Sequence, residues 1–495
     1  MSLQTVNFRA GTLALVEEST SGTLQKPAAN TDFSAIQSDI AISPGLENLT
    51  NDELRNNIMA GKQIVGRQNP TFTMSHYFRA GDSGTEPSYG VMLKAAMGAV
   101  KTITSEQAIT GVTDLKTFDV ADASEYEKGD LLLIQASSGN ECRPIESVVG
   151  NTITLAFELD NSPNIGALIG KPVTYQALND SNNIPTLSAW YYLPDTIEAL
   201  AGMRIEGVDI SFPAGELINA NYTGSGLSFF FDPLVIDASN DQINIDVSAT
   251  PYSASIPQKS YADPHELSEA VSNALNAISG TGVVFACSYN DDGKYTITGD
   301  SAFSIDGTQA NTILPTMAFD AVLSGALTSH TSQNLIDLTS GLTPVYDTNS
   351  DPIASKSNIL LIGSATDKMC VSNASVDASL ANTKADLLDG CQDSGVGATI
   401  FNERAATFSV TTWVQPYQAR FFRDLRKGEK VSFFMAASQI EGGAFIKNKT
   451  AGAYASHCTI TSLELSDSDG AAQLSMELAA FAPEDSTQSF YIGFV

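Results

Sequence analysis

The sequence predicts a mainly β protein in which one module of strand, helix, aromatic strand and hairpin occurs twice and carries two inserted domains. Three observations support this fold class. Short segments with alternating apolar residues fill most of the chain, one ordered pattern recurs in both halves, and two short helices are bounded by Pro and Gly. The first echo pairs TFTMS at 71–75 with TFSVT at 407–411, at an offset of 336 positions. Five alternating residues match easily by chance, so whether the module is duplicated depends on the order of the elements that follow in each half.

Composition limits the classes of function. The 495 residues contain 26 Lys and Arg against 56 Asp and Glu, a net charge of −30, which argues against a protein that wraps nucleic acid. Hydrophobic residues make up 43% of the chain, enough to bury a core, and no run of about 18 apolar residues predicts a membrane span. The start lacks the apolar segment of a secretory signal and the five cysteines are widely spaced. We therefore expect synthesis in a reducing cytoplasm.

Each half is predicted to contain one helix at the same place in the order. A helix over 88–97 starts after Pro87, a helix over 417–427 starts after Pro416, and a glycine follows each directly. Each helix is followed by an aromatic strand: LSAWYYL at 187–193 and KVSFFMA at 430–436.

A hairpin with an irregular first strand ends the pattern in each half. MRIEGVDI at 203–210 aligns with CTITSLEL at 458–465 at an offset of 255. The alternation of apolar residues slips at Gly207 in the first segment and at Ser462 in the second. A shared slip predicts a β-bulge at the same position of one strand in both halves.

A first insert interrupts the first half. Gly428 and Glu429 are almost all that joins the helix to the aromatic strand in the second half, whereas the first half uses 103–183 for the same step. That stretch consists of short strand patterns separated by Gly, Asn and Asp. We interpret 103–183 as a small inserted β-barrel that the module itself does not need.

A second insert is predicted over 233–325. It contains a hairpin, a helix and another hairpin, and the helix start is well marked. Asp263 can cap the helix, Pro264 takes its first position and Glu266 closes a capping box. This order resembles the insert domain of flagellins and of several phage structural proteins.

The predicted organisation follows from these patterns: 1–102 and 184–232 form the first module, 103–183 the small β-barrel, 233–325 the β-α-β insert, 326–352 a linker, and 353–495 the second module. Residues 40–66 and 370–400 are rich in Gly, Asn and Asp, and we expect long loops there.

The repeated module resembles the tail tube protein of long, non-contractile-tailed phages, the siphophages. The resemblance rests on GRQNPTFTMSHYFRAG at 66–81, the helix that ends at Gly98, the strand LSAWYYL, and MRIEGVDISFPAGELINANYTGSG at 203–226. It covers about 1–100, 184–232 and 355–495, and the second half is the fainter match.

The resemblance implies a structural subunit whose stacked rings surround a lumen for genomic DNA and the tape-measure protein. Since single-module relatives form six-subunit rings, two modules per chain imply trimeric rings with pseudo-sixfold symmetry. The implied partners are other copies of the chain, the tape-measure protein, and the tail terminator and distal tail proteins. DNA would pass without specific binding, no membrane is involved, and the location is the virion tail after assembly in the host cytoplasm.

In such a ring the polar face of the hairpin strands would line the channel, and the apolar face would pack beneath the helices. The lumen candidates are Arg204, Glu206, Asp209, Asn219, Asn221, Thr223, Thr459, Thr461, Glu464, Ser475 and Glu477. The apolar residues that alternate with them are Ile205, Val208, Ile210, Ile460, Leu463, Leu465, Met476 and Leu478. We expect an acidic lumen, because like charge in a narrow channel repels phosphate.

The sequence contains no pattern that predicts catalysis, a metal site or a cofactor. The four histidines lie in separate segments, and the acidic turn at 467–470 lacks the Glu that a calcium loop needs at its twelfth position, where Leu478 stands. The alternative function is a surface adhesin or filament subunit that binds host glycans through the inserts. A carbohydrate-active enzyme ranks below both.

Overall fold

The computed structural model describes most of the chain. The described residues are 11–28, 33–37, 39–49, 64–81, 84–178, 183–193, 196–320, 324–334, 351–363, 368–369, 371–389, 396–414, 419–441, 444–468, 470–482 and 489–495. Residues 1–10 of the predicted first module, residues 335–350 of the predicted linker, and Pro416 lie outside them. Strands dominate these ranges and three α-helices accompany them, so the mainly β fold class is confirmed. None of the described helices is long and apolar enough to cross a membrane.

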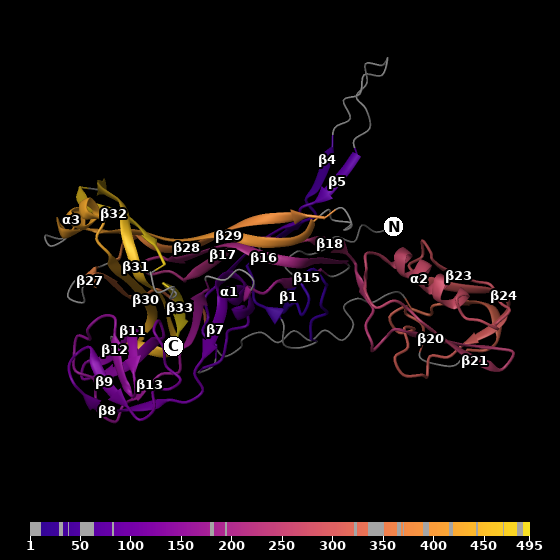
Figure 1. Cartoon of the computed structure of the whole chain (residues 1–495), viewed down its shortest axis with the longest axis horizontal. Coiled ribbons are helices and arrows are strands. Elements are labelled where there is room, and N and C mark those ends of the chain that lie inside the picture. The colour runs from indigo at the N-terminus through magenta and orange to yellow at the C-terminus, as the bar shows by residue number, and fades with distance from the viewer. Residues whose placement is uncertain are drawn as a thin grey trace, which may run out of the picture.

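Eight antiparallel strands form a long sheet that runs across the molecule (Figure 1). In spatial order they are β3 (Ala41–Ser43), β6 (Thr71–Tyr77), β17 (Asn219–Ser225), β16 (Thr196–Phe212), β28 (Val371–Leu388), β29 (Val396–Trp413), β32 (Ala471–Ala480) and β31 (Ala444–Ser468). The first four belong to the N-terminal half of the chain and the last four to the C-terminal half. The two halves meet where β16 pairs with β28.

Each half also has an outer sheet, and β16 and β31 run through both of their sheets. The N-terminal outer sheet contains β2 (Phe33–Ser34), β1 (Thr12–Glu17), β15 (Leu187–Leu193), the start of β16, and β18 (Ser228–Phe231). The C-terminal outer sheet contains β27 (Lys368–Met369), β26 (Ser357–Ile362), β30 (Val431–Glu441), the start of β31, β33 (Phe490–Phe494), β14 (Val173–Ala177) and β7 (Gly98–Thr102).

Strand registers agree between the two halves. Ala41 lies opposite Thr73 in the pair β3–β6, and the residues 336 positions later, Asp377 and Ser409, lie opposite each other in β28–β29. The register of β16 with β17 slips after Ile205, and that of β31 with β32 slips after Ile460. These are the two bulges predicted from the shared slip, and they are confirmed.

Residues 370–400 are not the long loop that their composition predicts, and the prediction is wrong for the described part. β28 is a long strand that pairs with both β16 and β29. Val376, Ala378 and Leu380 are buried and alternate with Asp377 and Ser379, so the segment has the period of a half-buried strand. Its small and polar side chains give it the composition of a loop. The expected loop over 40–66 likewise contains strands, β3 and the pair β4 (Leu46–Leu49) and β5 (Ile64–Gln68).

One helix covers the core in each half. α1 (Gly90–Met97) ends at Gly98, whose φ of 109° suits glycine, and α3 (Ala419–Lys427) ends before Gly428 with φ 64°. Both helix ends agree with the sequence prediction, whereas α1 begins two residues later than expected. α1 lies against β16 and α3 against β31, and apolar residues of both halves form one continuous core.

The first insert is a compact six-stranded sheet with a core of its own. Its strands, in spatial order, are β10 (Leu131–Ala136), β11 (Gly139–Val149), β12 (Thr152–Leu155), β9 (Thr117–Val120), β8 (Gln107–Val112) and β13 (Leu168–Ile169). β14 also falls within 103–183, but it pairs with β7 and β33 of the outer sheet. The insert therefore leaves and rejoins the main body through neighbouring strands.

The first insert also packs against the C-terminal half. Leu133 and Phe157 share an apolar cluster with Phe434 and Tyr454 of the outer sheet. The rings of Phe157 and Phe434 stack with their centroids 6.0 Å apart. Because these side chains are buried together, the insert covers the outer face of β30 and β31.

The second insert lies at the far end of the molecule (Figure 1). Its strands are β20 (Gln242–Val247), β21 (Thr250–Ser255), β23 (Phe285–Tyr289), β24 (Tyr295–Ile305) and β25 (Leu327–Thr331), with β19 (Leu234–Val235) paired to β22 (Ser260–Tyr261) at its base. β25 falls in the segment predicted as a linker and pairs with β24. α2 (Pro264–Asn276) starts as expected, because Asp263 accepts a hydrogen bond from the Glu266 amide. It ends at Asn276.

Candidate functional site

The candidate surface is the polar face of the long sheet. Six of the predicted lumen residues are exposed: Asp209, Asn221, Thr223, Thr461, Glu464 and Glu477. The other five are half-buried: Arg204, Glu206, Asn219, Thr459 and Ser475. Apolar residues between them, such as Val208, Ile210 and Leu478, are fully buried on the opposite face. The alternation of faces along these strands is as predicted.

Leu465 departs from the predicted apolar face. It is expected to pack beneath a helix, but 56% of it is exposed, whereas Ile210 at the corresponding position of β16 is 0% exposed. The difference has a local cause. β28 pairs beside Ile210, and no described strand pairs beside Leu465 on the outer side of β31.

Strand pairing brings residues of both halves into one polar row. Ser211 lies opposite Asp377, Asp377 opposite Ser409, and Ser409 opposite Glu477. The Ser211 hydroxyl donates a hydrogen bond of 2.6 Å to Asp377. The row therefore runs across four neighbouring strands without an apolar interruption.

Sequence reasoning missed the contributions of β6, β28 and β29 to this surface. Thr71, Thr73, Thr407 and Ser409 are exposed on the same face. Their signal is present in TFTMS and TFSVT, where Thr and Ser alternate with apolar residues. Asp377 could not be found in this way, because its strand has the composition of a loop.

Arg204 and Glu206 are held by contacts within the chain. The Arg204 guanidinium lies over the Phe401 ring, 5.4 Å from its centroid, and donates to the Ile184 carbonyl. Burial lowers the pKa of Arg204. Glu206 accepts a hydrogen bond from Ser225 and lies 3.2 Å from the Lys384 ammonium.

The same face carries the carboxylates of Asp209, Asp377, Glu403, Glu464 and Glu477. Lys384, which lies near the same face, is shared between Glu206 and Asp386. Arranged in rows with hydroxyl and amide side chains, these carboxylates make a hydrophilic surface of negative charge. Such a surface repels polyanions and does not favour phosphate binding.

A buried polar cluster fixes the junction between the halves. Arg404 donates to the carbonyls of Ala96 and Met97, at 2.9 and 2.7 Å, and to Asn382 at 2.7 Å. Asn382 donates in turn to the carbonyls of Ala96 and Ile205. Burial lowers the pKa of Arg404 to about 10, so it is charged at neutral pH. A cation here satisfies the last carbonyls of α1 and suits the negative end of the helix dipole.

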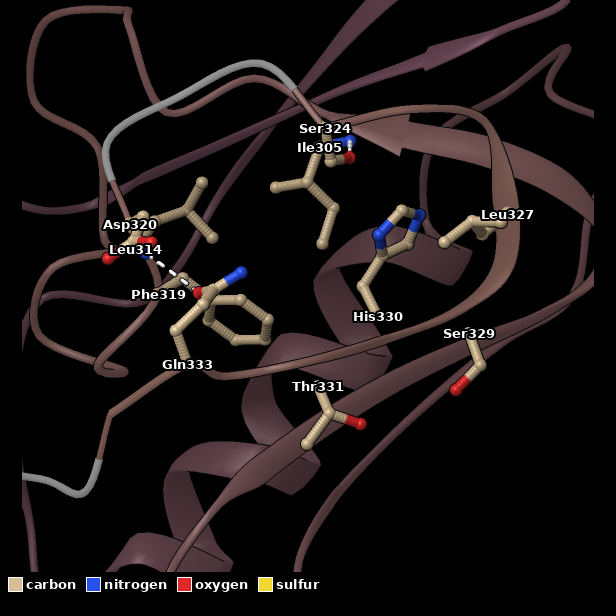
Figure 2. Close-up of a pocket in the computed structure, with 10 residues that line it drawn as sticks. All are labelled: Ile305, Leu314, Phe319, Asp320, Ser324, Leu327, Ser329, His330, Thr331 and Gln333. Carbon is tan, nitrogen blue, oxygen red and sulfur yellow. Dashed lines mark hydrogen bonds between the residues drawn. The ribbon is translucent and has the colours of Figure 1, made fainter.

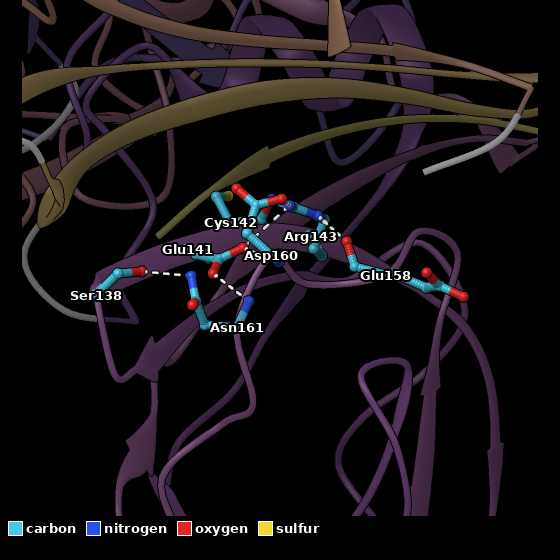
Figure 3. A network of polar contacts seen from close by, with 7 residues as sticks. All are labelled: Ser138, Glu141, Cys142, Arg143, Glu158, Asp160 and Asn161. Carbon is cyan, nitrogen blue, oxygen red and sulfur yellow. Dashed lines mark hydrogen bonds and ion pairs between the residues drawn. The ribbon is translucent and has the colours of Figure 1, made fainter. Parts of the chain in front are cut away.

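A second buried cation lies in the first insert (Figure 3). Arg143 is 0% exposed, donates to the carbonyls of Cys142 and Glu158, and pairs with Glu141 at 3.0 Å. Glu141 also accepts from the backbone amide of Asn161. With these bonds satisfied, the cluster holds β11 in place within the first insert.

A small cavity of about 210 Å³ lies in the second insert (Figure 2). His330 and Phe319 line it, and both are nearly buried. The His330 imidazole is 2.8 Å from the Phe303 carbonyl, and the Gln333 side chain accepts from the Asp320 amide. These polar groups therefore support the backbone of the insert.

The described residues contain no cluster of His, Cys, Asp or Glu that could hold a metal ion. His76 is buried against Tyr89 and Tyr222, and burial lowers its pKa to about 4. In the acidic turn, Asp467 accepts a hydrogen bond from the Gly470 amide, as in an ordinary hairpin.

One family of known proteins matches the chain over a long stretch. A sequence model of the family described as phage tail tube protein matches residues 9–258, just over half of the chain. No curated protein matches.

Solved structures show weaker similarity. The tube-terminating cap of the anti-feeding prophage is 17% identical, with 26% of this chain and 87% of that chain covered at a TM-score of 0.21. An Hcp protein is 12% identical, with 25% and 87% covered at a TM-score of 0.16. The SPP1 tail tube is 13% identical, with 29% and 68% covered at a TM-score of 0.16.

Proposed function

The chain belongs to the phage tail tube protein family, and from this premise we propose that it is a two-module subunit of the tail tube of a siphophage. The observation that carries the proposal is the agreement of strand order, register and bulges between the two halves of the long sheet. Each half supplies four strands, and β16 joins β28 as neighbouring modules would join in a ring.

Three chains would close the ring. A barrel closes when its strands complete a circle, so six modules from three chains would give about 24 strands around the lumen. The two halves differ in sequence and only one carries the first insert. The ring would therefore have threefold symmetry and a pseudo-sixfold appearance. Stacked rings in the virion tail would conduct DNA and the tape-measure protein, and would end at terminator and distal tail proteins.

The polar face of the long sheet would line the lumen. The exposed carboxylates support this orientation, because DNA slides past a surface that repels its phosphates. Lys in place of Asp209, Glu464 and Glu477 is expected to leave assembly intact and to slow genome ejection. The matched control is Glu269→Lys on α2, an exposed charge reversal far from this face. Equal ejection by both variants would contradict the assignment of the face.

Electron microscopy of the purified full-length protein tests the function directly. We expect hollow tubes of stacked rings with three copies of the chain in each ring. Six copies per ring would overturn the two-module proposal but retain a tube. Monomers that bind host cells and never form rings would support the adhesin alternative.

A further inference from the structure

The long sheet ends in two open edges among the described residues. At one edge, β3 pairs only with β6. At the other, the last residues of β31 pair only with β32. An open edge presents unpaired amide and carbonyl groups that can pair with another strand.

The internal junction provides a template for what each edge can bind. There, Gly207–Phe212 of β16 pair antiparallel with Val376–Ala381 of β28. β31 occupies the place of β16 in the C-terminal half, and β3 occupies the place of β28 in the N-terminal half. Each open edge is therefore the counterpart of one side of a junction that the chain already forms.

Exposed apolar side chains mark both edges. Leu465 on β31 is 56% exposed where its counterpart Ile210 is 0% exposed. Leu46, just beyond β3, is 48% exposed where its counterpart Asn382 is 5% exposed. A neighbouring strand at each edge would cover these side chains, as β28 covers Ile210.

We infer that the open edge of β31 in one copy pairs antiparallel with β3 of a second copy, with Leu465 opposite Ile42 and Glu464 opposite Ser43. The register follows from the internal pairs of Ile210 with Ala378 and of Asp209 with Ser379. Residues of β31 are numbered 255 higher than their counterparts in β16, and residues of β3 are numbered 336 lower than their counterparts in β28. The inference rests on the proposed function, since it names the partner surface that closes the ring.

The junction between copies is weaker than the internal one. Pro44 lacks an amide hydrogen and stands where Leu380 continues the internal pairing, so the strand contact is shorter. At the internal junction, Arg404 and Asn382 bind the end of α1. The corresponding residues of the N-terminal half are Gln68 and Leu46. The last turn of α3 already contains Arg426 and Lys427, and a neutral Gln68 avoids placing a third cation beside them. Rings therefore separate into chains before the two halves of a chain separate.

The register can be tested by cysteine cross-linking in assembled tubes. Glu464→Cys with Ser43→Cys places two exposed side chains directly opposite each other, within reach of a disulfide. The matched control is Glu464→Cys with Ala41→Cys, which moves the second thiol two residues along the same exposed edge. We expect catalysed oxidation to give disulfide-linked oligomers for the first pair only. The single-cysteine variants show how much cross-linking comes from the native cysteines, and this amount is subtracted.

A second variant keeps the test independent of cysteine chemistry. Because Leu465 is exposed in the single chain, Leu465→Ser should leave its melting temperature unchanged but raise the concentration needed for assembly about tenfold. Leu388→Ser, which alters another exposed leucine away from the edge, should do neither. Tubes that form without the selective cross-link would overturn the register and leave the proposed function standing. Absence of tubes from the unmodified chain would overturn the proposed function, and this inference with it.

Discussion

The two halves of the chain use the same strand order and register but cover their outer sheets differently. In the N-terminal half, Trp190 of β15 packs with Leu24 and Phe33, and its indole donates to the Gln25 carbonyl. In the C-terminal half, Phe434 at the corresponding position of β30 packs against Phe157 of the first insert. A short stretch of the chain thus covers one half, and a whole inserted domain covers the other. The first insert, although it belongs to the sequence of the N-terminal half, therefore completes the core of the C-terminal half.

Deletion of the first insert is expected to have the largest effect. Joining β7 to β14 by a short Gly turn in place of 104–171 keeps both strands but uncovers Leu361, Phe434, Tyr454 and Tyr491. Loss of several buried side chains should cost on the order of 5 kcal/mol of unfolding free energy. Urea unfolding measures it. Val149→Ser, at an exposed position of the same insert, is the control and should change little. Unchanged stability after deletion would show that the insert is independent of the C-terminal half.

The junction between the halves gives the next largest effect. Arg404→Ala leaves the carbonyls of Ala96, Met97 and Leu178 without this donor. Since hydrogen bonds to a charged group contribute more than neutral ones, the expected cost is about 3 kcal/mol. Gln68→Ala, at the corresponding position of the N-terminal half, should cost far less in the single chain. Equal losses of unfolding free energy for Arg404→Ala and Gln68→Ala in chemical unfolding would contradict the difference between the internal junction and the junction between copies.

Acid should weaken the N-terminal half selectively. His76 is neutral when folded, with a pKa of about 4, and it gains a proton in the unfolded chain near pH 6.5. The unfolded state therefore binds more protons between these values, and stability falls as pH falls. The free energy of unfolding should be lower by roughly 2 kcal/mol at about pH 5. The corresponding residue of the C-terminal half, Thr412, does not titrate. His76→Phe should flatten this part of the stability profile, and an unchanged slope would contradict the assignment.

The bulges should give the smallest effect. A Cβ on Gly207 would lie 2.7 Å from the Thr223 hydroxyl, so Gly207→Ser requires that side chain to move and should cost about 1 kcal/mol. Ser462 already has a side chain at the same bulge, and Ser462→Gly should cost about 0.5–1 kcal/mol through chain entropy. Thermal unfolding of both variants tests whether each bulge tolerates the residue that stands at the other bulge.

Local sequence patterns predicted only those features that depend on residues close together in the chain. Alternation and its slip located the bulges of β16 and β31, and Gly98 and Gly428 located the ends of two helices. β28 was missed because Ala, Ser and Asn give a strand the composition of a loop. The pairing of β16 with β28 has no local signal at all, since the partners are far apart in the chain. The exposure of Leu465 was missed for the same reason, because it depends on which strand lies beside it.

The long strands β16 and β31 have a mechanical consequence. β31 spans 25 residues and would extend about 80 Å if straight, and its first part pairs in the outer sheet while its last part pairs in the long sheet. Hydrogen bonds of an antiparallel pair lie perpendicular to the strands, so tension along β31 loads many of them in shear at once rather than opening them one by one. A bending tube would transmit its load from one sheet to the other through these two continuous strands, without a loop between them that could yield.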